Sequence, residues 1–323
     1  MSVGMLYLTS QSSGAPPLAG QNGSLCAVLD WALAQKGWTT EYTGANARVY
    51  RPPAGNRFRL YVAHDSAISG DARLATTRGC ENASSVTSLT DPFPTVAQYA
   101  NSQATFLVST TASAVARDYR IIVTDRMVLM FVNCAGQNNQ NWDMMVFGDV
   151  LGADAADVFG TIMHVGGVTT ATAANSRAMS NALCSIPAAP GRTFWARSID
   201  GTQKSTYGCY AGQANNATVT TFCSNGASAP VMRGGYNGRI VREKVGVHCI
   251  GSNTTTPNTL AVNKRGWVPN IWNPLHSGIG VVTSDDTFTD TGYSPSAVFN
   301  IAPAGTAVAV IIETTDTWSL PSG

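Results

Sequence analysis

The chain has 323 residues, of which only 12% are charged, with 20 Lys and Arg balanced by 19 Asp and Glu. Soluble domains usually carry roughly 25% charged residues, so the surface is predicted to consist of small neutral polar groups and to be covered in large part by partners. The near balance of charge, without a basic run, argues against phosphate-backbone binding. No stretch approaches the roughly 20 apolar residues that cross a bilayer. We therefore expect no nucleic-acid partner and no membrane insertion.

The N-terminal residues 1–23 are small, polar and rich in turn formers, including Gly14-Ala15-Pro16-Pro17, which predicts an extended N-terminal arm. This segment contains no basic stretch followed by an apolar one, so synthesis and retention in the cytosol until assembly are expected. An amphipathic helix is predicted over residues 24–36. Ser24 is its expected N-cap and Gly37 its left-handed stop. The apolar residues of its buried face recur at helical spacing: Leu25, Val28, Leu29, Ala32 and Leu33.

After Trp38 the pattern changes to alternation and short apolar runs, which predict β-strands. The predicted strands are Val49–Arg51, Phe58–Ala63, Thr105–Ser109, Tyr119–Thr124, Met127–Asn133 and Met144–Phe147. A bend at Asp125-Arg126 would keep two neighbouring core strands at ordinary length, so a hairpin is predicted there.

Residues 166–190 are small and polar, which indicates a linker or surface connection, with one short helix at Ser180–Leu183 as the alternative. Further strands are predicted at Phe194–Ser198, Thr218–Phe222, Arg239–Val247 and Ala307–Glu313. Residues 24–165 are then a β-rich domain with an N-terminal helix, and residues 191–323 a second β-rich region. The predicted fold class is mainly β, with one or two β-sandwich or barrel-like domains and one N-terminal amphipathic helix.

Seven cysteines occur without a CxxC pair, which argues against zinc-ribbon or thioredoxin-like chemistry. Cytosolic synthesis and an odd count favour buried, reduced thiols. Cys209 and Cys223 flank a potential hairpin and are the pair for which a disulfide is left open.

The four histidines, His64, His164, His248 and His276, lie far apart and none has a second ligand at i+4, so no helical zinc signature exists. His64-Asp65 could orient a serine nucleophile. However, no G-x-S-x-G elbow is present, and adjacent side chains of a strand point to opposite faces. A structural role is therefore expected for each histidine.

Two acidic groups could supply calcium ligands or a pair of carboxylates for glycoside cleavage. They are Asp149 with Asp154 and Asp157, and Asp285-Asp286 with Asp290. Neither group follows EF-hand spacing, and aspartates near Gly and Thr commonly accept backbone hydrogen bonds in turns, so structural roles are favoured. No nucleotide-binding motif occurs. We expect no catalytic residue, no metal site and no cofactor.

Seven tryptophans, including Trp267 and Trp272, could stack on sugars or mark an interface. In a β protein with so little charge, burial in the core or in an interface is favoured over carbohydrate binding.

Several short sequence motifs carry a resemblance to a known family. They are Ser12 to Pro16, Gly23-Ser24-Leu25, Val28-Leu29-Asp30, Arg51-Pro52, Phe58 to Val62, Arg78 to Glu81, Pro92-Phe93-Pro94, Lys264 to Trp272 and Glu313 to Trp318. In these motifs the chain resembles a family of virion structural proteins of tailed bacteriophages. The resemblance implies a structural role and no catalytic residues. Related chains often have an extra segment before Tyr50-Arg51-Pro52, which is missing here.

The expected function is that of a non-enzymatic, homo-oligomeric virion subunit in the tail, tail tip or baseplate, which contacts other virion proteins. A capsid decoration or head-tail connection protein is the alternative within the same class. Two alternatives come from other classes. One is a module that binds a host receptor or glycan through exposed aromatics, and the other is a cell-wall or polysaccharide hydrolase that uses carboxylates such as Asp149, Asp286 and Glu313.

Overall fold

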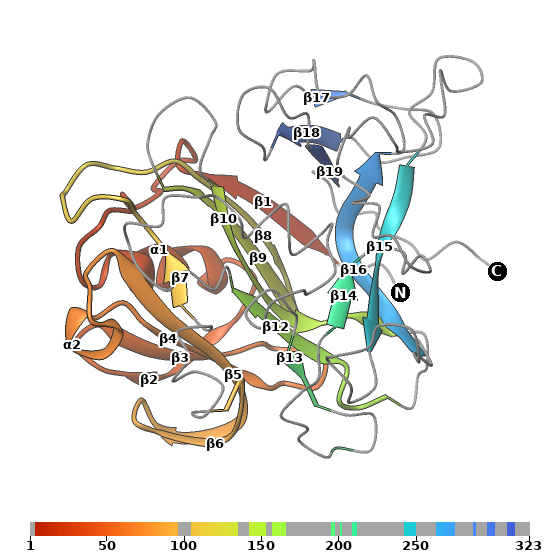
Figure 1. Ribbon diagram of the computed structural model, residues 1–323, viewed down its shortest axis with the longest axis horizontal. Helices are drawn as coiled ribbons and strands as arrows, with labels where there is room; N and C mark the ends of the chain where they lie inside the picture. Colours follow the sequence, from red (N-terminus) through yellow and green to blue (C-terminus); the bar gives the residue numbers. More distant parts are fainter. Residues whose placement is uncertain are drawn as a thin grey trace, which may run out of the picture.

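The computed structural model describes residues 4–95, 105–134, 142–152, 157–165, 195–197, 201, 209–211, 242–249, 263–274, 287–288, 296–300 and 309–313. These residues form three antiparallel sheets with two short helices, α1 (Ser24–Ala34) and α2 (Ser66–Ser69) (Figure 1). The predicted mainly β fold with an N-terminal amphipathic helix is thereby confirmed.

Sheet I has the strand order β1-β8-β9-β10-β12-β13. Its strands are β1 (Met5–Thr9), β8 (Tyr119–Thr124), β9 (Met127–Asn133), β10 (Trp142–Asp149), β12 (Thr161–Val165) and β13 (Trp195–Ala196). The predicted hairpin is confirmed, because Val123 of β8 pairs with Val128 of β9 on either side of Asp125-Arg126. All residues of β9 are buried, as its continuous apolar run requires.

Sheet II has the order β2-β3-β4-β5-β6, with β7 on a second stretch of β5. Its strands are β2 (Thr39–Thr43), β3 (Ala47–Arg51), β4 (Arg59–Ala63), β5 (Leu74–Ser85), β6 (Ser88–Phe93) and β7 (Thr105–Leu107). On the face of this sheet that does not contact α1, Val49 and Tyr61 pack together with Val86 and Leu89 of the β5–β6 hairpin. The hairpin therefore folds over its own sheet.

Sheet III has the order β14-β15-β16-β19-β18-β17, with β11 paired to β16. Its strands are β14 (Cys209–Ala211), β15 (Arg242–Cys249), β16 (Asn263–Pro274), β19 (Ala309–Glu313), β18 (Ser296–Asn300), β17 (Thr287–Phe288) and β11 (Leu151–Gly152). Two pairings, β12 with β13 and β11 with β16, join strands on either side of residues 166–190. The predicted linker itself and the strand at Thr218–Phe222 lie outside the described residues.

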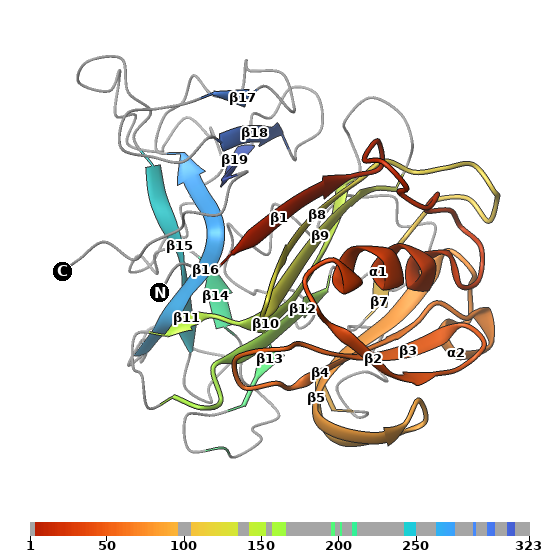
Figure 2. The same cartoon turned by 180° about the vertical axis from the view of Figure 1, so that it is seen from behind.

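The largest hydrophobic cluster joins α1 to sheets I and II. Leu25 and Leu29 of α1 belong to it together with Leu60 of sheet II and Met130 of sheet I, and all four are fully buried. Other residues of sheet I are buried but do not belong to this cluster. One of them is Leu129, which precedes Met130 in β9. Along the longest axis of the molecule, sheet I lies between α1 and sheet III (Figures 1 and 2).

Two predictions near the N-terminus are wrong. The expected extended arm contains β1, because Met5–Thr9 pairs antiparallel with β8 and forms the edge strand of sheet I. The N-cap of α1 is Gly23, while the side chain of Ser24 bonds with the backbone of Ala19. The predicted stop is confirmed by the left-handed φ of 75° at Gly37.

Candidate functional site

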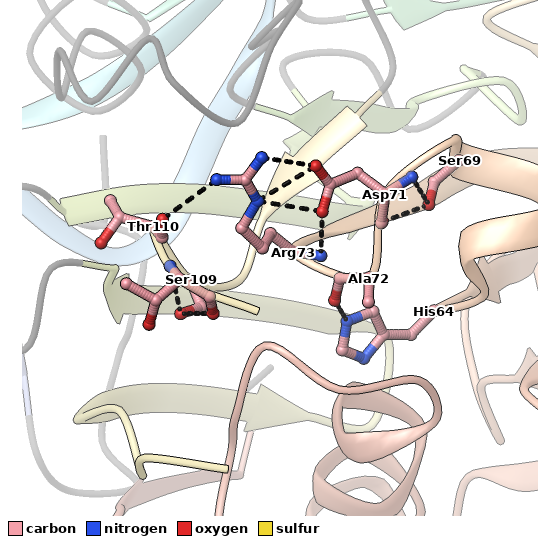
Figure 3. Close-up of polar contacts among 8 residues, drawn as sticks. His64, Ser69, Asp71, Ala72, Arg73, Ser109 and Thr110 are labelled. Carbon is pink, nitrogen blue, oxygen red and sulfur yellow. Dashed lines mark hydrogen bonds and ion pairs between the residues drawn. The ribbon is translucent and has the colours of Figure 1, made fainter. Parts of the chain in front are cut away.

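A polar junction connects sheet II to the segment that leads into sheet I (Figure 3). We define it by His64, Asp71, Arg73, Ser109 and Thr110. His64 follows β4, Asp71 and Arg73 precede β5, and Ser109 and Thr110 follow β7. The backbone carbonyl of Arg73 accepts hydrogen bonds from the N–H groups of Val108 and Ser109, at 2.9 and 3.4 Å.

His64 lies at the start of α1 and is fully buried. Its Nδ1 accepts a hydrogen bond from the Leu25 N–H at 3.1 Å, and its Nε2 lies 2.8 Å from the Ala72 carbonyl oxygen. Because Nδ1 accepts, Nε2 carries the proton and donates it to Ala72. The imidazole therefore satisfies an N–H group at the start of α1, which no side chain of the helix caps. Burial lowers the pKa of His64 and keeps the ring neutral.

The surroundings of His64 differ from a Ser-His-Asp site. The Ser24 hydroxyl lies 3.4 Å from Nδ1, but it donates to the Ala19 carbonyl oxygen at 2.6 Å. The Asp65 carboxylate turns away and accepts from the Ala67 N–H at the start of α2 and from the Asn46 amide. A catalytic histidine needs a free acceptor nitrogen and a carboxylate on the other nitrogen, and the hydrogen bonds of His64 provide neither.

Asp71 and Arg73 form a forked ion pair beside this histidine. Both Nε and Nη2 of Arg73 donate to the Asp71 carboxylate, at 2.6–3.0 Å. The bonds from Arg73 lower the pKa of Asp71. The Nη1 group of Arg73 reaches the Thr110 carbonyl oxygen at 3.2 Å, and the Thr110 N–H donates to the Cys134 carbonyl oxygen at 2.9 Å. This chain of contacts runs from sheet II to the end of β9, so the polar junction fastens two sheets together.

Asp149, at the end of β10, also has a carboxylate that is engaged in structural hydrogen bonds. Its carboxylate accepts from the Asn56 N–H at 2.6 Å and from the Thr161 hydroxyl. Burial is the largest influence on Asp149 and raises its pKa. A Cβ at Gly55 would lie 2.0 Å from the Asp149 carboxylate, so only glycine allows this close approach.

Of the remaining predicted acidic candidates, two lie in the described residues. Asp157 accepts from the Phe159 N–H at 3.0 Å, as expected of an aspartate in a turn. Glu313 is buried on β19. Asp154, Asp285, Asp286 and Asp290 lie outside the described residues. Within the described part of the chain, no group of three or more His, Cys, Asp and Glu residues could hold a metal ion.

Asp143 on β10 is a buried acid that the sequence analysis missed. Its carboxylate accepts from the Leu107 N–H of β7 at 2.7 Å and from the Met144 N–H at 2.9 Å. The side chain is almost completely enclosed, and burial raises its pKa to about 7. Asp143 therefore links sheet I to sheet II through a titratable group. The sequence feature that could have identified it is a single aspartate inside the apolar run Trp142 to Phe147.

A second cluster of charge lies where sheet II meets the end of β13. Glu41 of β2 pairs with Arg51 at 2.9 Å and with Arg59 at 3.0 Å. Arg59 also donates to the Glu81 carbonyl oxygen, and Arg197 pairs with the Glu81 carboxylate at 2.9 Å. In a chain with so few charges, these ion pairs connect β2 to its own sheet. They also connect sheet II to Arg197, the residue that follows β13.

β2 is an exposed edge strand of sheet II. Among the described strands it pairs only with β3. Its three threonines are exposed: Thr39, Thr40 and Thr43. The single charge of the strand, Glu41, is neutralised by the two arginines named above. Soluble monomers usually protect such edges with lysine, proline or a bulge. β2 has one of these devices, a register irregularity between Thr40 and Tyr42, but it has no lysine or proline. Its exposed threonines are neutral, β-branched side chains.

The tryptophan and histidine candidates whose side chains are described are mostly buried. Trp38, Trp195 and Trp272 are buried, and Trp267 is half-buried. His164 is buried on β12. The side chain of His248 and the whole of His276 lie outside the described residues.

The chain matches no protein-family model and no curated protein. None of the helices in the described ranges is long and apolar enough to span a membrane.

Proposed function

We propose that the chain is a structural subunit of a tailed-phage virion, in the tail, tail tip or baseplate. It acts there through self-association and contacts with other virion proteins. The observation that carries this proposal is the exposed edge of β2, whose one charged residue, Glu41, is held in ion pairs with arginines of its own sheet. Among the described strands β2 pairs on one side only, and the backbone N–H and C=O groups of such an edge can pair with a strand of another molecule, which is a common route to assembly of β proteins.

The charge of the molecule supports the same proposal. A net charge of +1 provides little repulsion between copies. The only charged residue of β2, Glu41, is paired with Arg51 and Arg59, so β2 presents no unpaired carboxylate to a second edge. Pairing between copies therefore costs little electrostatic free energy.

The short motifs that resemble phage virion proteins support the placement in a virion. Four of them fall in sheet II: Arg51-Pro52, Phe58 to Val62, Arg78 to Glu81 and Pro92 to Pro94. A resemblance concentrated in the sheet that carries the open edge is consistent with an assembly role for that sheet.

A double charge substitution on β2 should weaken self-association and leave the fold intact. Thr39 and Thr43 are paired in register with Arg51 and Arg48. In the variant Thr39→Glu/Thr43→Glu each new carboxylate thus faces an arginine of its own chain, which preserves the sheet. Two such edges would repel each other when they meet. We expect the self-association constant to fall at least about tenfold, as measured by sedimentation equilibrium.

The matched control is Ala112→Glu/Ala114→Glu, which adds the same charge to an exposed loop. This control should associate like the unmodified chain. Equal association of both double variants would remove β2 as the contact. A chain that is monomeric at all concentrations and absent from purified particles would overturn the proposed function.

The position in the particle can be measured by quantitative mass spectrometry of separated heads and tails. Enrichment in tails, at a copy number divisible by three or six, would support a ring in the tail or baseplate. Hundreds of copies on heads would instead identify a decoration protein.

A further inference from the structure

Two cysteines lie directly opposite each other in sheet III. Cys209, the first residue of β14, is the register partner of Cys249, the last residue of β15. The pairing continues without a shift through Tyr210 with His248 and Ala211 with Val247. The two cysteines therefore occupy one rung of an antiparallel ladder, although 39 residues separate them along the chain.

From this register we propose that Cys209 and Cys249 form a cross-strand disulfide that closes the β14–β15 ladder. Residues directly opposite in an antiparallel pair have Cα atoms about 4.5–5.5 Å apart. This spacing falls inside the range of about 4.4–6.8 Å found for disulfides. The register is therefore compatible with the bond, and the proposal is independent of the proposed function.

The described cysteines outside sheet III are poor competitors for this bond. Cys26, Cys80 and Cys134 are buried as free thiols. Burial raises the pKa of Cys26 to about 11 and that of Cys80 to about 12, and it raises the pKa of Cys134 well above the ordinary value. Because the thiolate is the species that attacks a disulfide, these three groups react slowly. Cys223, which the sequence suggested as the partner of Cys209, lies outside the described residues and is the competitor to test.

The oxidation balances with glutathione disulfide as the oxidant. One cysteine thiolate attacks glutathione disulfide, forms a mixed disulfide with one glutathione and releases the other as a thiolate. The second cysteine thiolate then attacks the protein sulfur of the mixed disulfide and releases the second glutathione. The protein loses two protons and two electrons, and glutathione disulfide is reduced to two glutathione molecules.

The test is equilibration of the purified chain in glutathione redox buffers, followed by acid quenching, alkylation and peptide mapping. We expect the alkylatable thiols to fall from seven to five, with Cys209 and Cys249 recovered in one linked peptide pair. The effective concentration of the two thiols should fall about tenfold or more in concentrated urea, where the ladder is lost. A bond between Cys209 and Cys223, or seven free thiols in every buffer, would overturn the proposal.

Serine variants separate this bond from unspecific oxidation. Cys249→Ser should abolish the loss of thiols, whereas Cys223→Ser should still lose two. If Cys249→Ser fails to fold, the peptide map of the unmodified chain decides alone, since it needs no variant. Loss of thiols in Cys249→Ser equal to that in the unmodified chain would also contradict the assignment.

Discussion

Replacing His64 with alanine should lower the free energy of unfolding by about 3–5 kcal/mol. The substitution opens a cavity at a fully buried position. It also leaves the Leu25 N–H and the Ala72 carbonyl without the partners that His64 supplies. Buried polar groups without partners cost more than the hydrogen bond contributed. Urea unfolding at pH 7, followed by circular dichroism, measures the change.

The neighbouring residue provides the matched control. Asp65→Ala removes the hydrogen bond to the Ala67 N–H, which caps the four-residue helix α2 at a more exposed position. Loss of an N-cap costs about 1 kcal/mol. If both variants lose the same stability, His64 is not the residue that holds α1 against sheet II.

The contacts of His64 also show where sequence reasoning stops. The apolar spacing of α1 predicts the helix and its buried face, and Gly37 marks its end, because both signals are local. The hydrogen bond that satisfies the start of α1 comes from a residue 39 positions later than Leu25. No local pattern identifies such a partner, so Ser24 was the natural but wrong choice for a cap.

The strands divide in the same way. β8 and β9 were predicted with their observed bounds, because continuous apolar runs indicate a sheet buried on both faces. β5 (Leu74–Ser85) was missed since it mixes glycine, threonine and charged residues. It is held in place by β4 on one side and by β6 and β7 on the other. Tertiary pairing, and not intrinsic propensity, makes that segment a strand. Asp143 was missed for a related reason, because its partner Leu107 belongs to another sheet.

Replacing Asp143 with asparagine should remove a pH-dependent loss of stability. Burial raises the pKa of Asp143 from 3.8 to about 7. The folded protein therefore holds this proton more tightly than the unfolded chain, and the stabilising contribution is fully present below about pH 4. It is lost as the pH rises to about 7. One pKa unit corresponds to about 1.4 kcal/mol, so the loss amounts to about 4 kcal/mol.

The expected result for Asp143→Asn is a free energy of unfolding that no longer declines from this source between pH 4 and 7. The amide oxygen can still accept from the Leu107 N–H, so the link between the sheets is retained. Denaturant titrations at a series of pH values measure the difference between variant and unmodified chain. Asp118→Asn, at an exposed position, should leave the profile unchanged. Superimposable profiles for Asp143→Asn and the unmodified chain would contradict the assignment.

His64 acts in the opposite direction over part of the same pH range. Its pKa is lowered from 6.5 by burial, so its contribution is present above about pH 6.5 and is lost as the pH falls. In the unmodified chain the two groups partly offset each other between about pH 4 and 6.5. Asp143→Asn should therefore reveal a stability that rises with pH, and His64→Ala should steepen the decline. Opposite changes of slope in two variants cannot come from a general loss of packing, because that would lower both profiles at every pH.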